Sequence, residues 1–143
     1  VDTERLAIYR RLYALGSAPQ LDEAAAELRD RFGQFPPEVE NLFGVVRLRL
    51  LASRIGFPKV AIAAETMEVE FPPEAEKSFY EAEQFQQIMH AISRMKGRGV
   101  ALRQLDSRLK LQVQLPKFAP ESDPIVAGLA LLEELSVGSS PTP

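Results

Sequence analysis

Apolar residues in the first third of the chain recur at intervals of three and four, the spacing that brings side chains onto one face of a helix. Three such stripes are present: one ends at Gly16, the second spans Leu21–Phe32, and the third falls within Pro37–Ile55. Gly33 follows the second stripe and is a suitable left-handed cap, because glycine has no Cβ. The pattern therefore predicts three consecutive helices, the second with a buried stripe that includes Phe32.

After Pro58 the period changes from helical to alternating. In Met67–Phe71 apolar and acidic residues alternate strictly, which sends one set of side chains to a core and the other to water. Leu109–Leu115 alternates in the same way. A short apolar segment precedes each of them, so we predict two hairpins. They span residues 60–71 and 100–115, with turns at 65–66 and 106–107.

Two further helices complete the predicted fold. One spans about Glu74–Met95, between the hairpins, and the other begins near Pro124. The order of elements predicts an α+β fold, with a mostly antiparallel sheet built from two hairpins and packed with about five helices on one face. We expect a single α+β domain over residues 1–137 and a disordered, proline-containing tail over residues 138–143.

Composition limits the possible classes of function. The chain has 143 residues, 45% of them apolar, which suits one domain with a real core. No apolar run approaches the roughly 20 residues that a membrane-spanning helix needs, and Val1–Arg5 lacks the layout of a secretory signal. Cysteine is absent, which excludes disulfides and thiolate chemistry and suits a reducing compartment, so we expect a cytoplasmic location.

Motifs for catalysis or cofactor binding are missing from the sequence. No phosphate-binding loop surrounds Gly97 and Gly99, and there is no Gly-x-Ser-x-Gly nucleophile elbow. His90 is the one histidine, which is too few for a usual catalytic zinc site. Glu68 and Glu70 could pair for acid–base chemistry, but the alternation places both in solvent. We therefore expect no enzyme activity, no metal and no cofactor.

Charge is distributed unevenly behind a net value of −3. Seven glutamates and one lysine lie between Glu65 and Glu83, whereas seven lysines and arginines with one aspartate lie between Arg94 and Lys117. Adjacent segments of opposite sign favour mutual neutralisation within the fold. The alternative is a small nucleic-acid-binding module that uses the basic 94–117 segment to contact phosphates, although aromatic residues for base stacking are not interleaved there.

The second predicted helix carries a charged face opposite its apolar stripe. At about 100° per residue, four charged residues fall roughly 180–280° from Leu21: Glu23, Glu27, Asp30 and Arg31. The simpler interpretation is a solvated face on which Glu27 and Arg31 pair at i, i+4 spacing. The other interpretation is a protein-binding face. The residues by themselves leave both open.

Several short sequence words occur in a fixed order around this helix. They are Arg5-Leu6, Tyr9-Arg10-Arg11-Leu12, Glu27-Leu28-Arg29-Asp30-Arg31-Phe32-Gly33, Pro36-Pro37-Glu38-Val39 and Arg47-Leu48-Arg49-Leu50-Leu51-Ala52. Together they resemble the C-terminal domain of the bacterial transcription-repair coupling factors (Mfd). The run that ends in Phe32-Gly33, with its following proline, is the most specific part. The resemblance is strong over residues 3–58, and beyond them only the order of predicted elements matches.

The resemblance implies a function in nucleotide excision repair of DNA damage. The parent proteins are multidomain ATP-driven DNA translocases that remove stalled RNA polymerase and recruit the repair machinery through UvrA. Their motor motifs are absent here, so we expect a non-catalytic fragment. In the family this domain is regulatory and autoinhibitory: it docks on the UvrB-like amino-terminal module of the same protein, masks the UvrA-binding surface and restrains the motor.

The same resemblance implies where this contact lies. The polar face of the helix before the Arg-Phe-Gly turn maps onto Glu27, Asp30 and Arg31. Glu23 shares that face and is included in the predicted protein interface. The expected partner is therefore the UvrB-like module within the same polypeptide, in indirect competition with UvrA. We expect no membrane contact and no direct contact with DNA.

Overall fold

A computed structural model of the chain describes the backbone of residues 2–139 and the side chains of residues 7, 8 and 10–136. The chain divides into two compact units, residues 1–51 and residues 52–143. The first unit is helical, and the second contains the sheet. α3 continues from the first unit into the second, since it spans residues 37–55.

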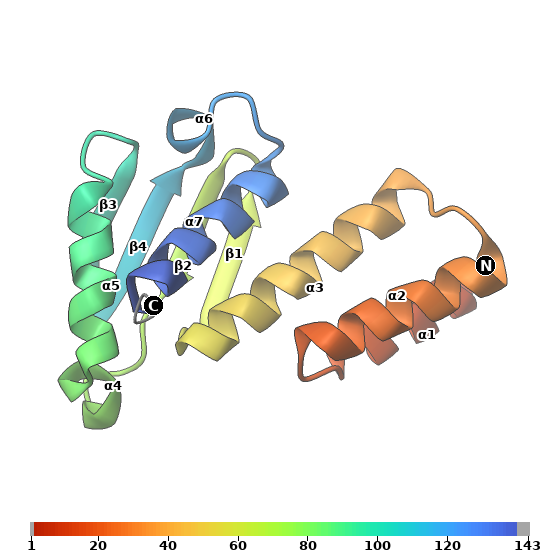
Figure 1. Cartoon of the computed structure of the whole chain (residues 1–143), viewed down its shortest axis with the longest axis horizontal. Helices are drawn as coiled ribbons and strands as arrows, with labels where there is room; N and C mark the ends of the chain where they lie inside the picture. The colour runs from red at the N-terminus through yellow and green to blue at the C-terminus, as the bar shows by residue number, and fades with distance from the viewer. Residues whose placement is uncertain (1, 140–143) are drawn as a thin grey trace. The chain divides into compact units, whose positions relative to one another are not determined.

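Seven helices and four strands are present in residues 2–139 (Figure 1). The helices are α1 (Asp2–Tyr13), α2 (Ala18–Phe32), α3 (Pro37–Ile55), α4 (Lys77–Glu81), α5 (Glu83–Arg94), α6 (Leu115–Phe118) and α7 (Pro124–Ser139). The strands are β1 (Lys59–Ala63), β2 (Thr66–Glu70), β3 (Val100–Leu105) and β4 (Arg108–Gln114). α7 includes the first two residues of the predicted tail, and residues 140–143 of that tail lie outside the described residues.

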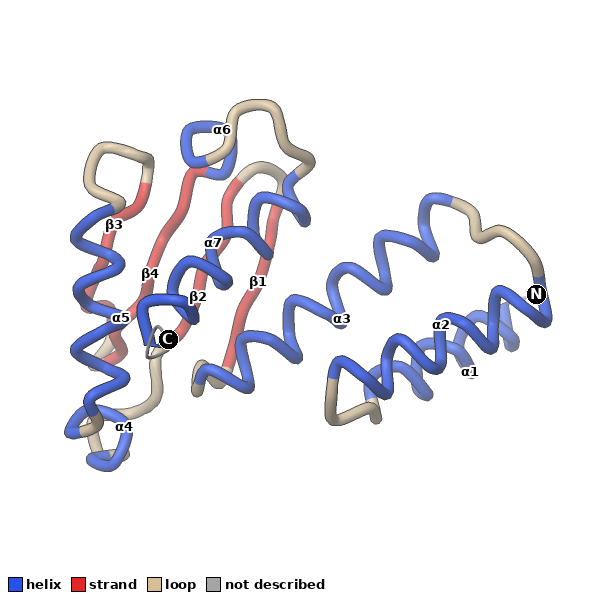
Figure 2. The backbone as a smooth tube through the Cα atoms, in the orientation of Figure 1, coloured by secondary structure: helices blue, strands red, loops and turns tan. Residues whose placement is uncertain are grey.

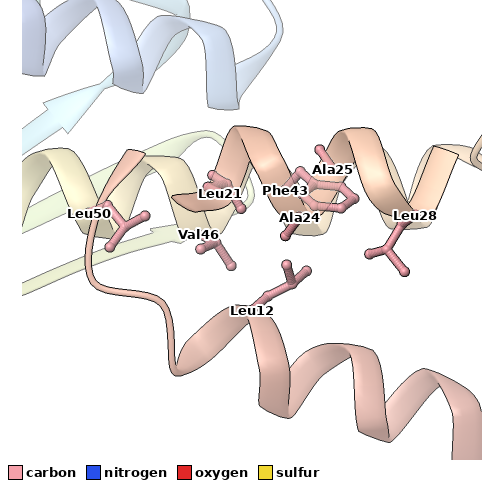
Figure 3. Packing of buried hydrophobic residues seen from close by; sticks show 8 residues of the cluster. All are labelled: Leu12, Leu21, Ala24, Ala25, Leu28, Phe43, Val46 and Leu50. Atoms are coloured by element: carbon pink, nitrogen blue, oxygen red, sulfur yellow. The ribbon is translucent and has the colours of Figure 1, made fainter. Parts of the chain in front are cut away.

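In the helical unit, α1, α2 and the first part of α3 share one apolar core (Figure 3). Its buried members are Leu12, Leu21, Ala24, Ala25, Leu28, Phe43, Val46 and Leu50. Ser17 caps the N-terminus of α2, because its hydroxyl oxygen accepts a hydrogen bond from the backbone N–H of Gln20 at 3.4 Å. Gly33 ends α2 at a φ of 81° and donates its N–H to the Arg29 carbonyl at 2.8 Å. These caps fix the extent of the helix that carries the charged face.

The four strands form one antiparallel sheet in the order β1-β2-β4-β3 (Figure 2). The two hairpins join through β2 and β4, where Met67 lies opposite Val113 and Val69 lies opposite Leu111. All four of these side chains are buried. The pairing confirms the predicted α+β fold with an antiparallel sheet built from two hairpins.

Each hairpin closes with a two-residue loop. The second loop, Asp106-Ser107, falls where it was predicted, and both residues have positive φ angles of 50° and 63°. Such loops match the right-handed twist of the flanking strands. The first loop is Ala64-Glu65, one residue earlier than predicted, because Thr66 pairs with Ala63 across the hairpin.

Within the sheet unit, α5 and α7 lie along one face of the sheet (Figure 1). They also contact each other. α5 buries Ile88 and Ala91, and α7 buries Leu131 and Leu135. The buried side chains of β2 alternate with the half-exposed Glu68 and Glu70. α5 and α7 therefore cover one face of the sheet and leave the charged side chains of the strands on the other.

The predicted fourth helix, Glu74–Met95, is wrong as a single element. Ala82 has extended backbone (φ −74°, ψ 147°) and separates α4 from α5. In an unbroken helix Phe79 and Phe85 would point about 120° apart. Instead their ring centroids lie 5.7 Å apart, and both rings pack against Phe71, at 6.1 Å and 6.5 Å. The packing of both rings on Phe71 therefore favours the break between α4 and α5. The spacing of apolar residues within the segment does not predict this break.

Candidate protein-binding face

α2 turns its charged residues away from the helical core. The residues that enter the core are all buried: Leu21, Ala24, Ala25 and Leu28. The four predicted site residues are all exposed: Glu23, Glu27, Asp30 and Arg31. The structure thus places all four outside the core, on the surface of one helix. This division follows from the spacing of apolar residues alone.

Phe32 corrects the predicted buried stripe, because its side chain is 53% exposed. The core cluster includes Leu28 but not Phe32, the last residue of α2, so the ring lies in solvent. The guanidinium carbon of Arg31 lies 5.3 Å from its ring centroid. Exposed aromatic rings and arginines are both enriched in protein interfaces. We define the α2 face as its four exposed charged residues, Glu23, Glu27, Asp30 and Arg31.

Glu27 pairs with Arg11 of α1 and not, as the simpler interpretation had it, with Arg31. Nη2 of Arg11 lies 2.7 Å from Oε2 of Glu27, and Nη1 lies 3.4 Å from Oε1. The hydrogen bond from Arg11 is the main cause that lowers the pKa of Glu27, and the charge of Arg31 adds a smaller effect. The partner of Glu27 is 16 residues away, so the helix wheel could not reveal it.

Two exposed ion pairs connect α2 to α3. Nη2 of Arg47 lies 2.6 Å from Oδ1 of Asp22, and Nη2 of Arg29 lies 3.3 Å from Oε1 of Glu40. The Arg29 guanidinium also lies 5.1 Å from the ring centroid of Phe35. Asp22 and Arg29 are therefore engaged within the helical unit. Among the residues described, Glu23 and Asp30 of the α2 face have no such ion pair.

The acidic and basic segments of the sheet unit neutralise each other, as their adjacency predicted. Nη1 of Arg108 lies 2.7 Å from Oε2 of Glu70, and Nζ of Lys110 lies 3.4 Å from Oε1 of Glu68. These pairs connect β4 to β2 across the sheet. Arg98 is likewise engaged, because its guanidinium lies 4.2 Å from the Phe118 ring centroid. Arg98, Arg108 and Lys110 of the 94–117 segment are thus already engaged within the fold.

The face of the sheet opposite α5 and α7 carries a groove of about 430 Å³. Small side chains such as Ala61, Ala63 and Ala101 line it, together with Glu68 and Arg103. In the part of the chain that the structure describes, no three His, Asp or Glu side chains are grouped closely enough to hold a metal ion. In that same part, no helix combines the length and the apolar character needed to cross a bilayer.

Comparisons with known proteins connect the first 82 residues to one family. Residues 1–82 match the model of the TRCF domain. The transcription-repair-coupling factor of Haemophilus influenzae is 35% identical over 72 residues, which are 50% of this chain and 6% of that protein. The same factor of Staphylococcus epidermidis is 28% identical over 92 residues, or 64% of this chain and 8% of that protein. The chain thus spans less than a tenth of these relatives.

A solved structure extends the comparison over most of the fold. A crystal structure of the C-terminal domain of a transcription-repair coupling factor superposes with a TM-score of 0.67 at 18% identity. The match covers 96% of this chain and 81% of that one, so it includes the sheet unit. At this identity the likeness concerns the fold alone. The match over residues 1–82, which contains the whole α2 face, shows that the chain belongs to the TRCF domain family.

Proposed function

We propose that this domain is regulatory and acts by binding, without chemistry of its own. The α2 face docks on the UvrB-like amino-terminal module of the same protein. There it masks the UvrA-binding surface and restrains the DNA-translocase motor during transcription-coupled nucleotide excision repair. One observation carries the proposal: the three residues that the family resemblance implies, Glu27, Asp30 and Arg31, share one exposed helix face within the segment that matches the family.

The composition of the α2 face suits a reversible contact with a basic surface. Asp30 and Glu23 are exposed and, among the described residues, have no ion pair, so their carboxylates can accept hydrogen bonds from arginines of a partner. Charged groups at the edge of a contact set register and association rate more than affinity. Such a face can therefore close and still release.

Release is what an autoinhibitory switch requires. A closed state that is only moderately more stable than the open one can be opened by a ligand that prefers the open state. UvrA is such a ligand, because its binding surface on the amino-terminal module is masked in the closed state. The α2 face supplies the contact that this ligand must break. The caps at Ser17 and Gly33 fix the residues at which α2 begins and ends.

The direct test is charge reversal on the α2 face in the full-length protein. We expect Glu27→Lys with Asp30→Lys to raise the affinity for UvrA about tenfold, a usual size for coupling between sites. The reason is that two lysines repel the basic surface on which the domain docks. ATPase activity should rise with it, because the motor is no longer restrained. UvrA binding is measured by titration, and ATPase activity is measured in the absence of polymerase.

The matched control also reverses two charges, Glu121→Lys with Glu133→Lys, both at exposed positions outside α2. It should leave UvrA binding and ATPase activity unchanged. If the reversed α2 face gives the same UvrA affinity and the same repressed ATPase as the wild type, α2 does not make the docking contact. If the double control changes both readouts equally, the effect comes from net charge and not from the α2 face.

A further inference from the structure

Arg11 of α1 already holds the carboxylate that the proposed docking contact uses. Both oxygens of Glu27 face its guanidinium, at 2.7 Å and 3.4 Å. The lowered pKa of Glu27 has this hydrogen bond as its main cause. Asp30, one turn further along α2, has no ion pair among the residues described. The acidic groups of the α2 face therefore differ: one is occupied within the domain, and the other is open.

We propose that Arg11 is a positioning residue that weakens docking by competing with a partner arginine for Glu27. This inference rests on the proposed function of the α2 face. A guanidinium binds a carboxylate best through two parallel N–H bonds. Arg11 occupies that geometry in the free domain. An arginine on the docking surface can take the same position only after Arg11 has given up at least one of its bonds.

Arg11 also reduces the negative charge that the face presents. Glu23, Glu27 and Asp30 outnumber Arg31, so the α2 face alone has an excess of two negative charges. The guanidinium of Arg11, bonded to Glu27, lowers that excess to one. A less negative face attracts a basic surface more slowly and holds it less tightly. The geometric and the electrostatic effects of Arg11 thus have the same sign.

The exposure of the pair makes Arg11 a regulator of docking strength and not a barrier to docking. The side chains of Arg11 and Glu27 are 43% and 59% exposed. Exposed ion pairs in water are weak, because solvent competes for both groups. A partner can therefore displace Arg11, and the displacement only subtracts from the affinity. This keeps the closed state reversible.

The test is Arg11→Gln in the full-length protein, with UvrA as the probe. Without the competing guanidinium the closed state becomes more stable, so we expect UvrA affinity to fall by roughly two- to fivefold, the range set by an exposed ion pair. In a Glu27→Gln background the same substitution should have a clearly smaller effect, because no carboxylate is left for which Arg11 competes. Arg11→Lys keeps the cation and should stay closer to the wild type than Arg11→Gln does.

Arg10→Gln is the matched control, since it removes the same charge from the neighbouring exposed residue of α1. It should leave UvrA affinity unchanged, and thermal unfolding of the 143-residue chain should show that all variants are folded. The inference is overturned if Arg11→Gln raises UvrA affinity, leaves it unchanged, or lowers it equally in the Glu27→Gln background. A Glu27→Gln substitution that by itself fails to raise UvrA affinity contradicts the proposed function instead.

Discussion

Two surfaces of this domain carry the same types of charged residue in different surroundings. On the sheet, Glu70 of β2 is only 21% exposed and is bonded to Arg108, with Lys110 at 3.9 Å. On the α2 face, Asp30 is exposed and has no ion pair in the part of the chain described. The acidic groups of the sheet are thus used inside the fold. On α2, two acidic residues, Glu23 and Asp30, have no ion pair among the residues described.

The difference has a geometric cause. β2 is paired on both sides, so each of its outward side chains has a neighbour at a fixed register position, as Glu70 has in Lys110. α2 has a core-facing side and a side whose charged residues are all exposed. Charges on a central strand therefore stabilise the fold, whereas charges on an exposed helix face remain available to a partner. This difference is a further reason to propose α2 as the docking surface.

The strongest way to test this comparison is to reverse a charge on the sheet. Glu70→Lys places a third cation beside Arg108 and Lys110 and removes the carboxylate that both contact. We expect the free energy of unfolding to fall by about 1–3 kcal/mol. Chemical denaturation measures it. Glu121→Lys, at an exposed loop position, is the control, and a loss no larger than in that control would show that the sheet pairs do not stabilise the fold.

The same reversal on the helix should act on binding and not on stability. Asp30→Lys removes no ion pair that the structure shows, so we expect the free energy of unfolding to stay within about 0.5 kcal/mol of the wild type. UvrA affinity of the full-length protein should nevertheless rise. A destabilisation as large as that of Glu70→Lys would contradict the distinction between the two surfaces.

The smallest expected effect concerns the occupied residue of the α2 face. NMR titration should give Glu27 a pKa below the ordinary glutamate value, and Arg11→Gln should raise it towards that value. Because the folded state favours the carboxylate, the pair contributes to stability above the unfolded pKa of Glu27 and loses that contribution as the pH falls through its lowered folded pKa. An unshifted pKa in the wild type would mean that Arg11 does not hold Glu27 in solution.

Much of the fold could be predicted from the sequence, because it depends on the spacing of apolar residues within single helices and strands. The alternation in Met67–Phe71 predicts which side chains of β2 are buried, and the spacing of Leu21, Ala25 and Leu28 predicts the core-facing side of α2. The stop at Gly33 is also local. Phe32 has the right spacing for the core and is exposed all the same. Whether a side chain at a helix end is covered depends on neighbours that the spacing does not encode.

The sequence by itself determined α1, α2, α3 and α7, the two hairpins and the charged side of α2, since each follows from residue spacing within one element. Only the tertiary structure decided which charges are already in use. Glu27 meets Arg11 across 16 residues, and Glu70 meets Arg108 across 38. The break at Ala82 likewise follows from ring packing against Phe71, the residue directly after β2. Such pairings depend on which elements pack side by side, and the spacing of residues within one element does not contain that information.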